Sequence, residues 1–258
     1  MKVFITGASS GIGAAMAREY AKGGARLGLV ARRADALERL ASELREAGAK
    51  VHVYAADVTD ASAMRVALDD FAATAAGGAS SIDRVIANAG IGIGDTLRSG
   101  DAEAVAQLIR VNVIGVTNTL VPAIPMMLKQ GTGTLVAVSS VAGFRGLPGR
   151  AAYSASKAAI LTFMEALRMQ LVGTGVHAMT LCPGFVRTPL TATLTHKLPF
   201  LMEVDEAARD MVQAVEQRKA TFTLPWQMNL LRHVVAHAPE WLVRRMAPPA
   251  RSQGAMSG

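Results

Sequence analysis

The sequence predicts an α/β protein in which a doubly wound parallel sheet of about seven strands carries helices on both faces of a single domain. The first observation is that predicted strands and helices alternate along the chain without a break, which implies parallel strands joined by right-handed crossovers. The second is that strands such as 134–138, TLVAV, are apolar runs without polar alternation, as expected when both faces of a sheet are covered. A length of 258 residues suits one domain of this class.

The elements follow in order from the composition of each segment. Short segments of β-branched, aliphatic or aromatic residues predict strands at 2–6, 26–31, 51–55, 83–87, 133–139, 175–181 and 221–224. Helices are predicted between them at 12–23, 34–47, 60–76, 102–129, 151–172 and 204–218. Ligands of such sheets bind beyond the carboxyl ends of the strands, so the functional residues are expected there.

The composition favours a compact protein with a large core, since 51% of the residues are hydrophobic and 18% are charged. No run approaches the ~20 apolar residues of a membrane span. The single cysteine, Cys182, excludes an internal disulfide and indicates a reducing compartment. The first strand starts at residue 2, so we expect no signal peptide and a cytoplasmic location. No motif or aromatic array accompanies the net charge of +7, so we expect neither nucleic acid nor a metal as ligand.

A glycine-rich turn joins the first strand to the first helix. Gly7, Gly11 and Gly13 have the spacing G-x-x-x-G-x-G. In this context they allow a tight turn, a close backbone approach to a pyrophosphate and a helix that starts near the sheet. The first N–H groups of the helix then face the phosphates. We therefore predict a Rossmann-like dinucleotide site. The same turn contributes further candidate contacts, Ser9, Ser10 and Ile12.

The end of the second strand indicates which dinucleotide is bound. An acidic residue there accepts hydrogen bonds from the ribose 2′-OH of NAD, whereas an arginine favours the 2′-phosphate of NADP. Here Ala31 ends the strand and Arg32 and Arg33 follow, and a planar guanidinium suits bidentate phosphate binding. We expect NADP(H) to be preferred. The alternative, that both arginines only end the strand in solvent, leaves NAD(H) open.

Tyr153 and Lys157 lie four residues apart in the predicted helix 151–172, and so on one face of it. A free phenol titrates near pH ~10. An ammonium about 4 Å away, at an effective dielectric constant of ~20, favours the phenolate by about 4 kcal/mol as an upper bound. We therefore expect Lys157 to lower the pKa of Tyr153 and allow proton transfer near neutral pH.

Together these features resemble the short-chain dehydrogenase/reductase family, of the Tyr-x-x-x-Lys type, over about residues 2–190. The motifs that carry the resemblance are Thr6-Gly7-x-x-x-Gly11-x-Gly13, Ala56-Asp57-Val58, Asn88-Ala89-Gly90, Asn112-x-x-Gly115, Ser140, Tyr153-x-x-x-Lys157 and Pro183-Gly184. Each motif is weak alone, but seven in the expected order are specific. The resemblance implies hydride transfer between a nicotinamide cofactor and a carbinol or carbonyl carbon.

The resemblance gives roles to four catalytic candidates. Tyr153 is the acid/base, and Lys157 also holds the nicotinamide ribose. Ser140 hydrogen-bonds the substrate oxygen, and it is chosen over Ser139 because the family spacing from serine to tyrosine is thirteen residues. Asn112 positions a water that connects Lys157 to solvent, while a purely structural hydrogen bond in the core is an equally open interpretation.

A second set of residues is expected around the cofactor, again by resemblance. The first five contact the adenosine and the last four the nicotinamide side: Asp57, Val58, Asn88, Ala89, Gly90, Pro183, Gly184, Val186 and Thr188. For Thr188, a helix N-cap before Pro189 is the open alternative.

The substrate pocket depends on loop side chains. Residues 185–203 are the predicted mobile lid, with apolar members Leu190, Leu194, Leu198, Phe200 and Met202. The opposite wall is expected at Ile91, Ile93, Val141, Phe144 and Leu147. An apolar pocket favours a ketone, aldehyde, steroid-like or acyl substrate. Recognition of a carboxylate or carrier phosphate by Arg145, Arg150 or Arg187 remains open.

The predicted dinucleotide-binding and catalytic domain covers 1–224, followed by a basic amphipathic extension at 225–247 and a disordered tail at 248–258. Residues 218–258 hold six Lys or Arg and one acid, and so +5 of the +7 of the chain. The apolar stripe of the extension is expected to pack on the domain or on a partner subunit. Contact with an anionic membrane surface is the less favoured alternative.

The expected function is that of an NADP(H)-dependent oxidoreductase interconverting an alcohol and a ketone or aldehyde on a largely apolar substrate. The alternative is a cofactor-binding sensor or scaffold without turnover, and the presence of both Tyr153 and Lys157 favours the enzyme. Isomerase or dehydratase chemistry usually goes with altered tyrosine and serine sets. The resemblance also implies a homodimer or homotetramer formed through helices 102–129 and 151–172.

Overall fold

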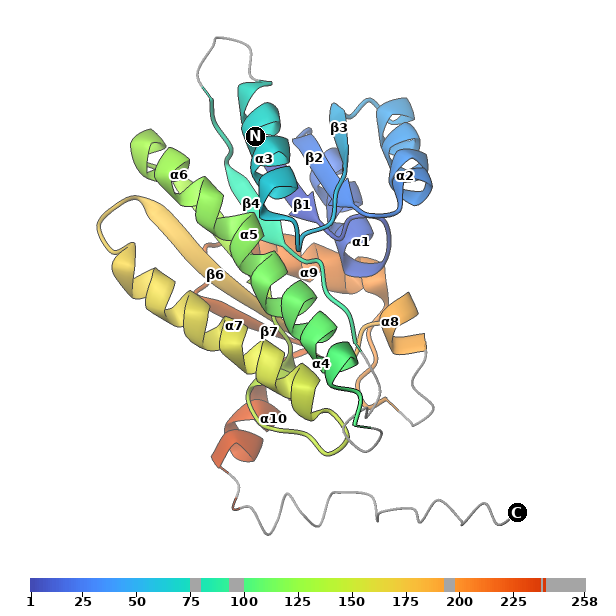
Figure 1. Cartoon of the computed structure of the whole chain (residues 1–258), viewed down its shortest axis with the longest axis vertical. Helices are drawn as coiled ribbons and strands as arrows, with labels where there is room; N and C mark the ends of the chain where they lie inside the picture. The colour runs from blue at the N-terminus through green and yellow to red at the C-terminus, as the bar shows by residue number, and fades with distance from the viewer. Residues whose placement is uncertain (75–79, 93–99, 193–197, 238, 240–258) are drawn as a thin grey trace.

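The computed structural model describes residues 1–74, 80–92, 100–192, 198–237 and 239. The seven predicted strands form one parallel sheet (Figure 1). They are β1 Lys2–Thr6, β2 Arg26–Ala31, β3 Val51–Ala55, β4 Arg84–Ala87, β5 Gly133–Val138, β6 Val176–Pro183 and β7 Thr221–Leu224. Their order is β3-β2-β1-β4-β5-β6-β7, which confirms the predicted fold.

The chain runs outward from β1 to β3 and then returns to β4 on the other side of β1. The strand order therefore reverses between β1 and β4. In a sheet of this kind the crevice at the carboxyl ends of these two strands is the place for a ligand.

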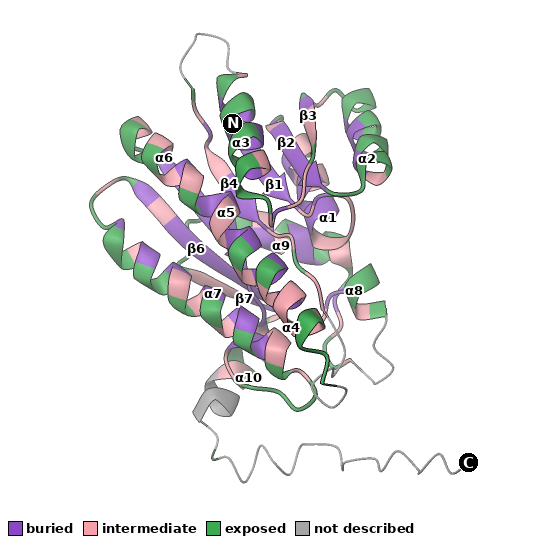
Figure 2. Cartoon of the chain, in the orientation of Figure 1, coloured by how far each residue is buried: buried purple, intermediate pink, exposed green. Residues whose placement is uncertain are grey.

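Helices cover both faces of the sheet. They are α1 Gly11–Lys22, α2 Ala34–Glu46, α3 Ala61–Ala73, α4 Ala102–Ile109, α5 Gly115–Leu120, α6 Ile124–Gln130, α7 Ala151–Gln170, α8 Pro189–Ala192, α9 Val204–Glu216 and α10 Trp226–His237. Side chains of α1, α2 and α9 form one buried apolar cluster, and side chains of α3, α5 and α7 form the other (Figure 2). The two-sided covering explains why β5 is buried along its whole length.

Local chemistry accounts for several helix ends. The Asp60 carboxylate accepts a hydrogen bond from the Ala63 N–H at 2.9 Å and caps α3, and Asp101 caps α4 in the same way through Ala104. Gly131 ends α6 in the left-handed conformation, with φ of 70°. The six predicted helices agree with the structure to within three residues at each end, apart from the internal breaks in 102–129.

The predicted helix 102–129 is a composite of α4, a π-helical turn at Arg110–Ile114, α5, a 3-10 turn at Val121–Ala123, and α6. By length and composition the run Ala102–Gln130 would pass for a membrane span, with a hydropathy of 1.5, contrary to the expectation from the sequence. Its side chains Val116 and Leu120 are nevertheless buried in the cluster shared with α3 and α7. Packing inside the domain accounts for the part of its apolar character that these buried side chains carry.

The predicted C-terminal extension begins with α10. Met228 is buried, and a Cβ on Gly184 would lie 2.9 Å from its Cγ, so this part of the helix packs closely on the end of β6. Trp226 and Leu230 point outward, 70% and 63% exposed. The tail 248–258 lies outside the described residues.

Candidate active site

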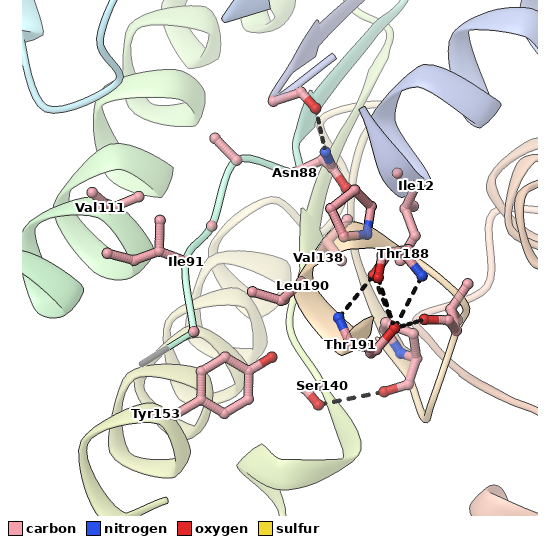
Figure 3. A pocket seen from close by; sticks show the side chains of 18 of the residues that line it. Ile12, Asn88, Ile91, Val111, Val138, Ser140, Tyr153, Thr188, Leu190 and Thr191 are labelled. Carbon is pink, nitrogen blue, oxygen red and sulfur yellow. Dashed lines mark hydrogen bonds between the residues drawn. The ribbon is translucent and has the colours of Figure 1, made fainter. Parts of the chain in front are cut away.

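A cavity of about 530 Å³ lies at the carboxyl ends of the central strands (Figure 3). Most of the predicted site residues line it: Gly7, Ser9, Ser10, Gly11, Ile12, Arg32, Arg33, Asp57, Val58, Asn88, Ala89, Gly90, Ser140, Tyr153, Lys157, Pro183, Gly184, Val186 and Thr188. The other two, Gly13 and Asn112, lie behind its wall. The fold thus brings residues from the whole length of the domain to one place.

The glycine-rich turn packs so closely on neighbouring backbone that larger residues would not fit. Gly7 and Gly11 have φ of 68° and 57°, a region that favours glycine. A Cβ on Gly7 would lie 2.7 Å from the Ala89 Cα, and one on Gly13 would lie 2.4 Å from the Gly7 carbonyl oxygen. Glycine is therefore required at these points, and the first turn of α1 starts directly over the cavity.

Asn88 ties the ends of β1 and β4 together across the switch point. Its Nδ2 donates to the carbonyls of Thr6 and Gly7 at 3.0 and 3.2 Å, and its backbone N–H donates to the Thr6 hydroxyl at 3.2 Å. Asn88 and Ile12 both line the cavity (Figure 3). Asn88 therefore holds the glycine turn in place as well as lining the pocket.

The two arginines after β2 lie in different environments. The Arg33 guanidinium donates to the hydroxyls of Ser9 and Ser10 at 3.1 and 2.8 Å, whereas Arg32 lies 3.8 Å from the Asp57 carboxylate. Asp57 also accepts hydrogen bonds from the backbone and hydroxyl of Thr59, both at 2.9 Å. Arg33, Ser9 and Ser10 thus bring three polar groups together at the glycine turn. Both arginines were predicted from the sequence, and Arg33 is the one that contacts the turn.

Asn112 occupies the π-helical turn and is completely buried. Its Oδ1 accepts from the Ile91 N–H at 2.8 Å, and its Nδ2 donates to the Ile91 carbonyl at 3.0 Å and to the Ser156 hydroxyl at 3.2 Å. The side chain thereby joins the loop after β4 to α7. These contacts are those expected if Asn112 makes a structural hydrogen bond in the core. Its role in positioning a water stays a prediction.

Two adjacent serines after β5 point to different partners. Ser139 donates to the Lys157 carbonyl at 2.8 Å and fixes β5 against α7. Ser140 accepts from the Ala142 N–H at 3.2 Å and faces the Pro183 carbonyl at 3.4 Å, and Figure 3 shows it near Tyr153. Ser140 is thus the serine beside the phenol, as the sequence spacing predicts.

Tyr153 is half-buried on α7 and directed at the cavity. Burial raises the pKa of its phenol, while a hydrogen bond with Ser140 and the positive charge of Arg150 lower it. The expectation that Lys157 lowers the pKa of Tyr153 is not what this structure shows. Burial outweighs the charges, and the phenol is therefore protonated at neutral pH.

Lys157 is buried one helical turn after Tyr153. Its Nζ donates to the Val138 carbonyl at 3.0 Å and lies 5.7 Å from the centroid of the Tyr153 ring. Burial lowers the pKa of Lys157 to about 8. A Cβ on Gly90 would lie 3.5 Å from the same Nζ, so Gly90 keeps the space in front of the ammonium open.

The loop after β6 brings threonines to the cavity. The Thr188 hydroxyl lies 3.4 Å from the Thr191 N–H at the start of α8, and the Thr191 hydroxyl donates to the Val186 carbonyl at 2.7 Å (Figure 3). Thr188 thus makes a long N-cap contact and also lines the cavity, so both interpretations stand. Sequence reasoning missed Thr191, whose only indication was its place three residues after Thr188.

The base of the predicted lid 185–203 is anchored by a short bridge between Val186 and Met202. The Arg187 N–H donates to the Met202 carbonyl at 2.9 Å, and the Met202 N–H donates to the Phe185 carbonyl at 3.0 Å. Arg187 also pairs with Glu203 at 2.8 Å. The described ends of the lid are therefore pinned to each other.

The predicted apolar walls are realised in part. Ile91, Val141, Leu147 and Leu190 line the cavity. Within the described residues, Leu198, Phe200, Met202 and Phe144 do not; Met202 is held in the bridge, and Phe144 instead lies under the Arg232 guanidinium at 4.8 Å. Ile93 and Leu194 lie outside the described residues. Pro148 also lines the cavity and was not predicted, and so do Phe185 and Thr191, which the sequence placed in the lid without naming them as wall residues.

No group of three or more His, Cys, Asp or Glu side chains is placed to hold a metal within the part of the chain that the structure describes. Cys182 is buried, and burial raises the pKa of its thiol to about 12, with Arg232, Lys157 and Arg168 acting in the opposite direction. A protonated, buried thiol has the character of a core residue.

Comparisons with known proteins agree with this geometry. A family profile described as short chain dehydrogenase matches residues 1–199. An uncharacterized oxidoreductase of Myxococcus xanthus is 42% identical over 224 residues, which are 87% of each chain.

Solved structures give the same result. A short-chain dehydrogenase from Sphingobium yanoikuyae in complex with NADPH has a TM-score of 0.78 at 30% identity, covering 93% of this chain and 96% of the other. A short chain dehydrogenase/reductase from Burkholderia phymatum in complex with NAD has a TM-score of 0.82 at 25% identity, covering 96% and 95%.

Proposed function

The chain belongs to the short-chain dehydrogenase/reductase family of NAD(P)-binding oxidoreductases, and from this premise we propose that it is an NADP(H)-dependent enzyme that interconverts an alcohol and a ketone or aldehyde. The observation that carries the proposal is the convergence of Tyr153, Ser140 and Lys157 on the cavity that begins at the glycine turn.

The residues present fit a dinucleotide. Gly7 and Gly13 let the turn pack closely on neighbouring backbone, and Gly7 and Gly11 line the cavity. Ser10 at the start of α1 makes no side-chain cap, so the first N–H groups of the helix remain available for phosphate oxygens. In this proposal Lys157 would hold the nicotinamide ribose. The bound cofactor would supply or accept the hydride.

Side chains of the protein would transfer the proton to or from the substrate oxygen. In carbonyl reduction the Tyr153 hydroxyl donates its proton to the substrate oxygen, and Ser140 hydrogen-bonds the same oxygen as negative charge develops on it. A raised pKa keeps Tyr153 in the donor form at neutral pH. In alcohol oxidation the proton moves the other way, which needs the phenolate and is favoured at higher pH.

Preference for NADP(H) is supported by the basic pair after β2. Arg33 and its partners Ser9 and Ser10 offer a guanidinium and two hydroxyls side by side at the glycine turn. Three such groups suit a 2′-phosphate, which carries several strong acceptor oxygens. Arg32 adds a second cation nearby, partly balanced by Asp57.

The test is a titration of the protein with NADPH and NADH, followed by fluorescence. We expect tighter binding of NADPH, and we expect Arg33→Ala to weaken NADPH binding by about 10- to 100-fold through loss of a charged hydrogen bond, with little change for NADH. Arg32→Ala should have a smaller effect, and Arg39→Ala on the exposed face of α2 is the matched control. Equal binding of both cofactors would overturn the preference, and binding of neither would overturn the proposed enzyme.

We also propose that the protein forms a homo-oligomer, because apolar side chains are exposed on two neighbouring helical segments. Ile114, Val121 and Leu128 recur every seven residues along α4–α6, and they are 46%, 45% and 43% exposed. Met169 and Val172 at the end of α7 are 66% and 80% exposed. An apolar stripe of this kind on a neighbouring pair of helices suits a subunit interface. Light scattering of wild type and Val121→Glu would test it, since a monomeric wild type would contradict it.

A further inference from the structure

Three arginines could have recognised an anionic substrate, and the structure separates them. Arg187 pairs with Glu203 at 2.8 Å, and its side chain is 64% exposed. Neither Arg187 nor Arg145 is among the described residues that line the cavity, whereas Arg150 lines it together with Leu147 and Pro148.

Arg150 is held close to the catalytic phenol. Arg150 is the residue directly before α7 and stands three positions before Tyr153, and both residues line the cavity. Its positive charge lowers the pKa of Tyr153, which places the guanidinium within electrostatic reach of the phenol.

The main chain around Arg150 is fixed by hydrogen bonds. The Arg150 N–H donates to the Leu147 carbonyl at 3.0 Å, and the Arg150 carbonyl accepts from the Ser154 N–H at 2.7 Å. The Ser154 hydroxyl in turn accepts from the Leu147 N–H at 3.2 Å. The turn that carries the guanidinium is therefore preorganised, which lowers the ordering cost of binding a ligand.

The charge of Arg150 is not balanced by the protein within the described residues. The carboxylate among the described lining residues is Asp57, which lies with Arg32 at the ends of β2 and β3. Arg150 forms no ion pair in that part of the chain, whereas Arg84 pairs with Glu216 at 2.9 Å. A half-buried guanidinium without a counter-ion gains strongly from an anion that enters the cavity.

We infer that Arg150 binds an anionic group of the substrate, and that the substrate class is an oxo carboxylate with an apolar body. The inference rests on the proposed function. Tyr153 and Ser140 take the carbonyl oxygen, and Arg150 takes the carboxylate in a bidentate pair.

The size of the cavity bounds the substrate. Arg150 and Tyr153 line the same cavity of about 530 Å³, so we expect the carboxylate and the carbonyl to belong to one small molecule. Ile91, Val141 and Leu147 contact the apolar body.

The test compares acids with their neutral esters. The probes are 4-oxo-4-phenylbutanoate and 4-oxopentanoate, each beside its methyl ester, with NADPH oxidation followed by absorbance. Each turnover transfers a hydride from NADPH and one proton to the ketone, giving the 4-hydroxy compound and NADP⁺. The measured quantity is the ratio of kcat/KM for the acid to kcat/KM for the ester, which a general loss of folding or of hydride transfer does not alter.

We expect wild type to favour the acids and Arg150→Gln to lower the acid-to-ester ratio by about 10- to 100-fold, the loss of one charge-assisted hydrogen-bonded pair. Arg150→Lys should keep part of the ratio because it keeps the charge. Arg187→Gln, whose side chain pairs with Glu203 outside the cavity, should leave the ratio at the wild-type value.

The remaining outcomes overturn either this inference or the function beneath it. Wild type that reduces esters and acids equally well, or an Arg150→Gln ratio equal to that of wild type, overturns the role of Arg150 and leaves the carbonyl reductase in place. NADPH binding without turnover of any of the four probes overturns the oxo-carboxylate class. Absence of NADPH binding overturns the proposed function itself.

Discussion

The two ends of the cavity are built from different parts of the chain. At the end formed by the glycine turn, the shape comes from backbone: Gly7 and Gly13 approach neighbouring main-chain atoms closely, and Asn88 holds two carbonyls. At the other end the walls are loop side chains such as Leu147 and Leu190. A surface made of backbone admits very few residue types, while a wall of side chains admits many. The first end therefore binds a ligand of one kind, and the second end sets which substrate reacts.

The largest effect that would sharpen this contrast is expected from Tyr153→Phe. The change removes a proton donor and leaves the ring in place, so kcat should fall by about 10²- to 10⁴-fold while the NADPH dissociation constant changes far less. Stopped-flow assays and a fluorescence titration measure the two quantities on the same sample. A loss of NADPH affinity as large as the loss of kcat would assign Tyr153 to the cofactor end and remove the contrast.

Lys157 lies where the two ends meet, and its burial predicts a pH-dependent stability. Its pKa is about 8 in the folded chain and 10.5 in the reference state. Between those values the unfolded chain binds more protons, so this group makes folding more favourable as pH rises, by about 1.4 kcal/mol per pH unit in that window, and adds no slope below it.

The measurement is urea unfolding of wild type and Lys157→Met at several pH values from 7 to 10. Cys182 and the tyrosines titrate in both proteins, so their contributions cancel when the free energy of unfolding of the variant is subtracted from that of wild type. The difference should rise above pH ~8, because Lys157 alone is missing from the variant. A difference that stays flat would mean that the ammonium is solvated.

Two glycine substitutions, one in the glycine turn and one in a loop, should differ in their effect on stability. A Cβ on Gly13 would lie 2.4 Å from the Gly7 carbonyl oxygen, whereas a Cβ on Gly146, in the loop before α7, would meet nothing within 4 Å. Gly13→Ala should lower the free energy of unfolding by about 1–3 kcal/mol and weaken NADPH binding. Gly146→Ala should change stability by less than about 0.5 kcal/mol. Thermal unfolding of both variants decides this, and equal stabilities would show that the turn adapts.

The smallest effect is expected from Leu147→Ala at the substrate end. Leu147 lines the cavity and is 37% exposed, so its loss should raise KM for an apolar ketone several-fold, the equivalent of about 1 kcal/mol of apolar contact, with NADPH affinity unchanged. Val66→Ala on α3 is the control, since Val66 is 66% exposed and lies outside the described lining. An equal change of KM in both variants would contradict the assignment of Leu147.

The same contrast explains what the sequence could predict. Alternating elements and apolar strands predicted the sheet, and the glycine spacing predicted the glycine turn, because close backbone contacts demand glycine. The spacing of thirteen residues before Tyr153 selected Ser140 over Ser139, and the structure places Ser140 beside the phenol.

Other features depend on packing that no local pattern records. The π-helical turn at Asn112 and the inward turn of Lys157 to the Val138 carbonyl depend on neighbouring elements. The partner of Ser9 and Ser10 proved to be Arg33, although its neighbour Arg32 has the same chemistry. Which loop arginine reaches the cavity likewise depends on the turn before α7.

The most direct measurement of the central claim is the fate of the cofactor hydrogen. Wild type would be incubated with a panel of ketones and aldehydes and with NADPH that carries deuterium at the transferred position of nicotinamide C4. The masses of the alcohol products would be measured by mass spectrometry. We expect alcohols that carry one deuterium at the carbinol carbon, formed by wild type and far more slowly by Tyr153→Phe. Bound NADPH with no labelled alcohol from any carbonyl would contradict it.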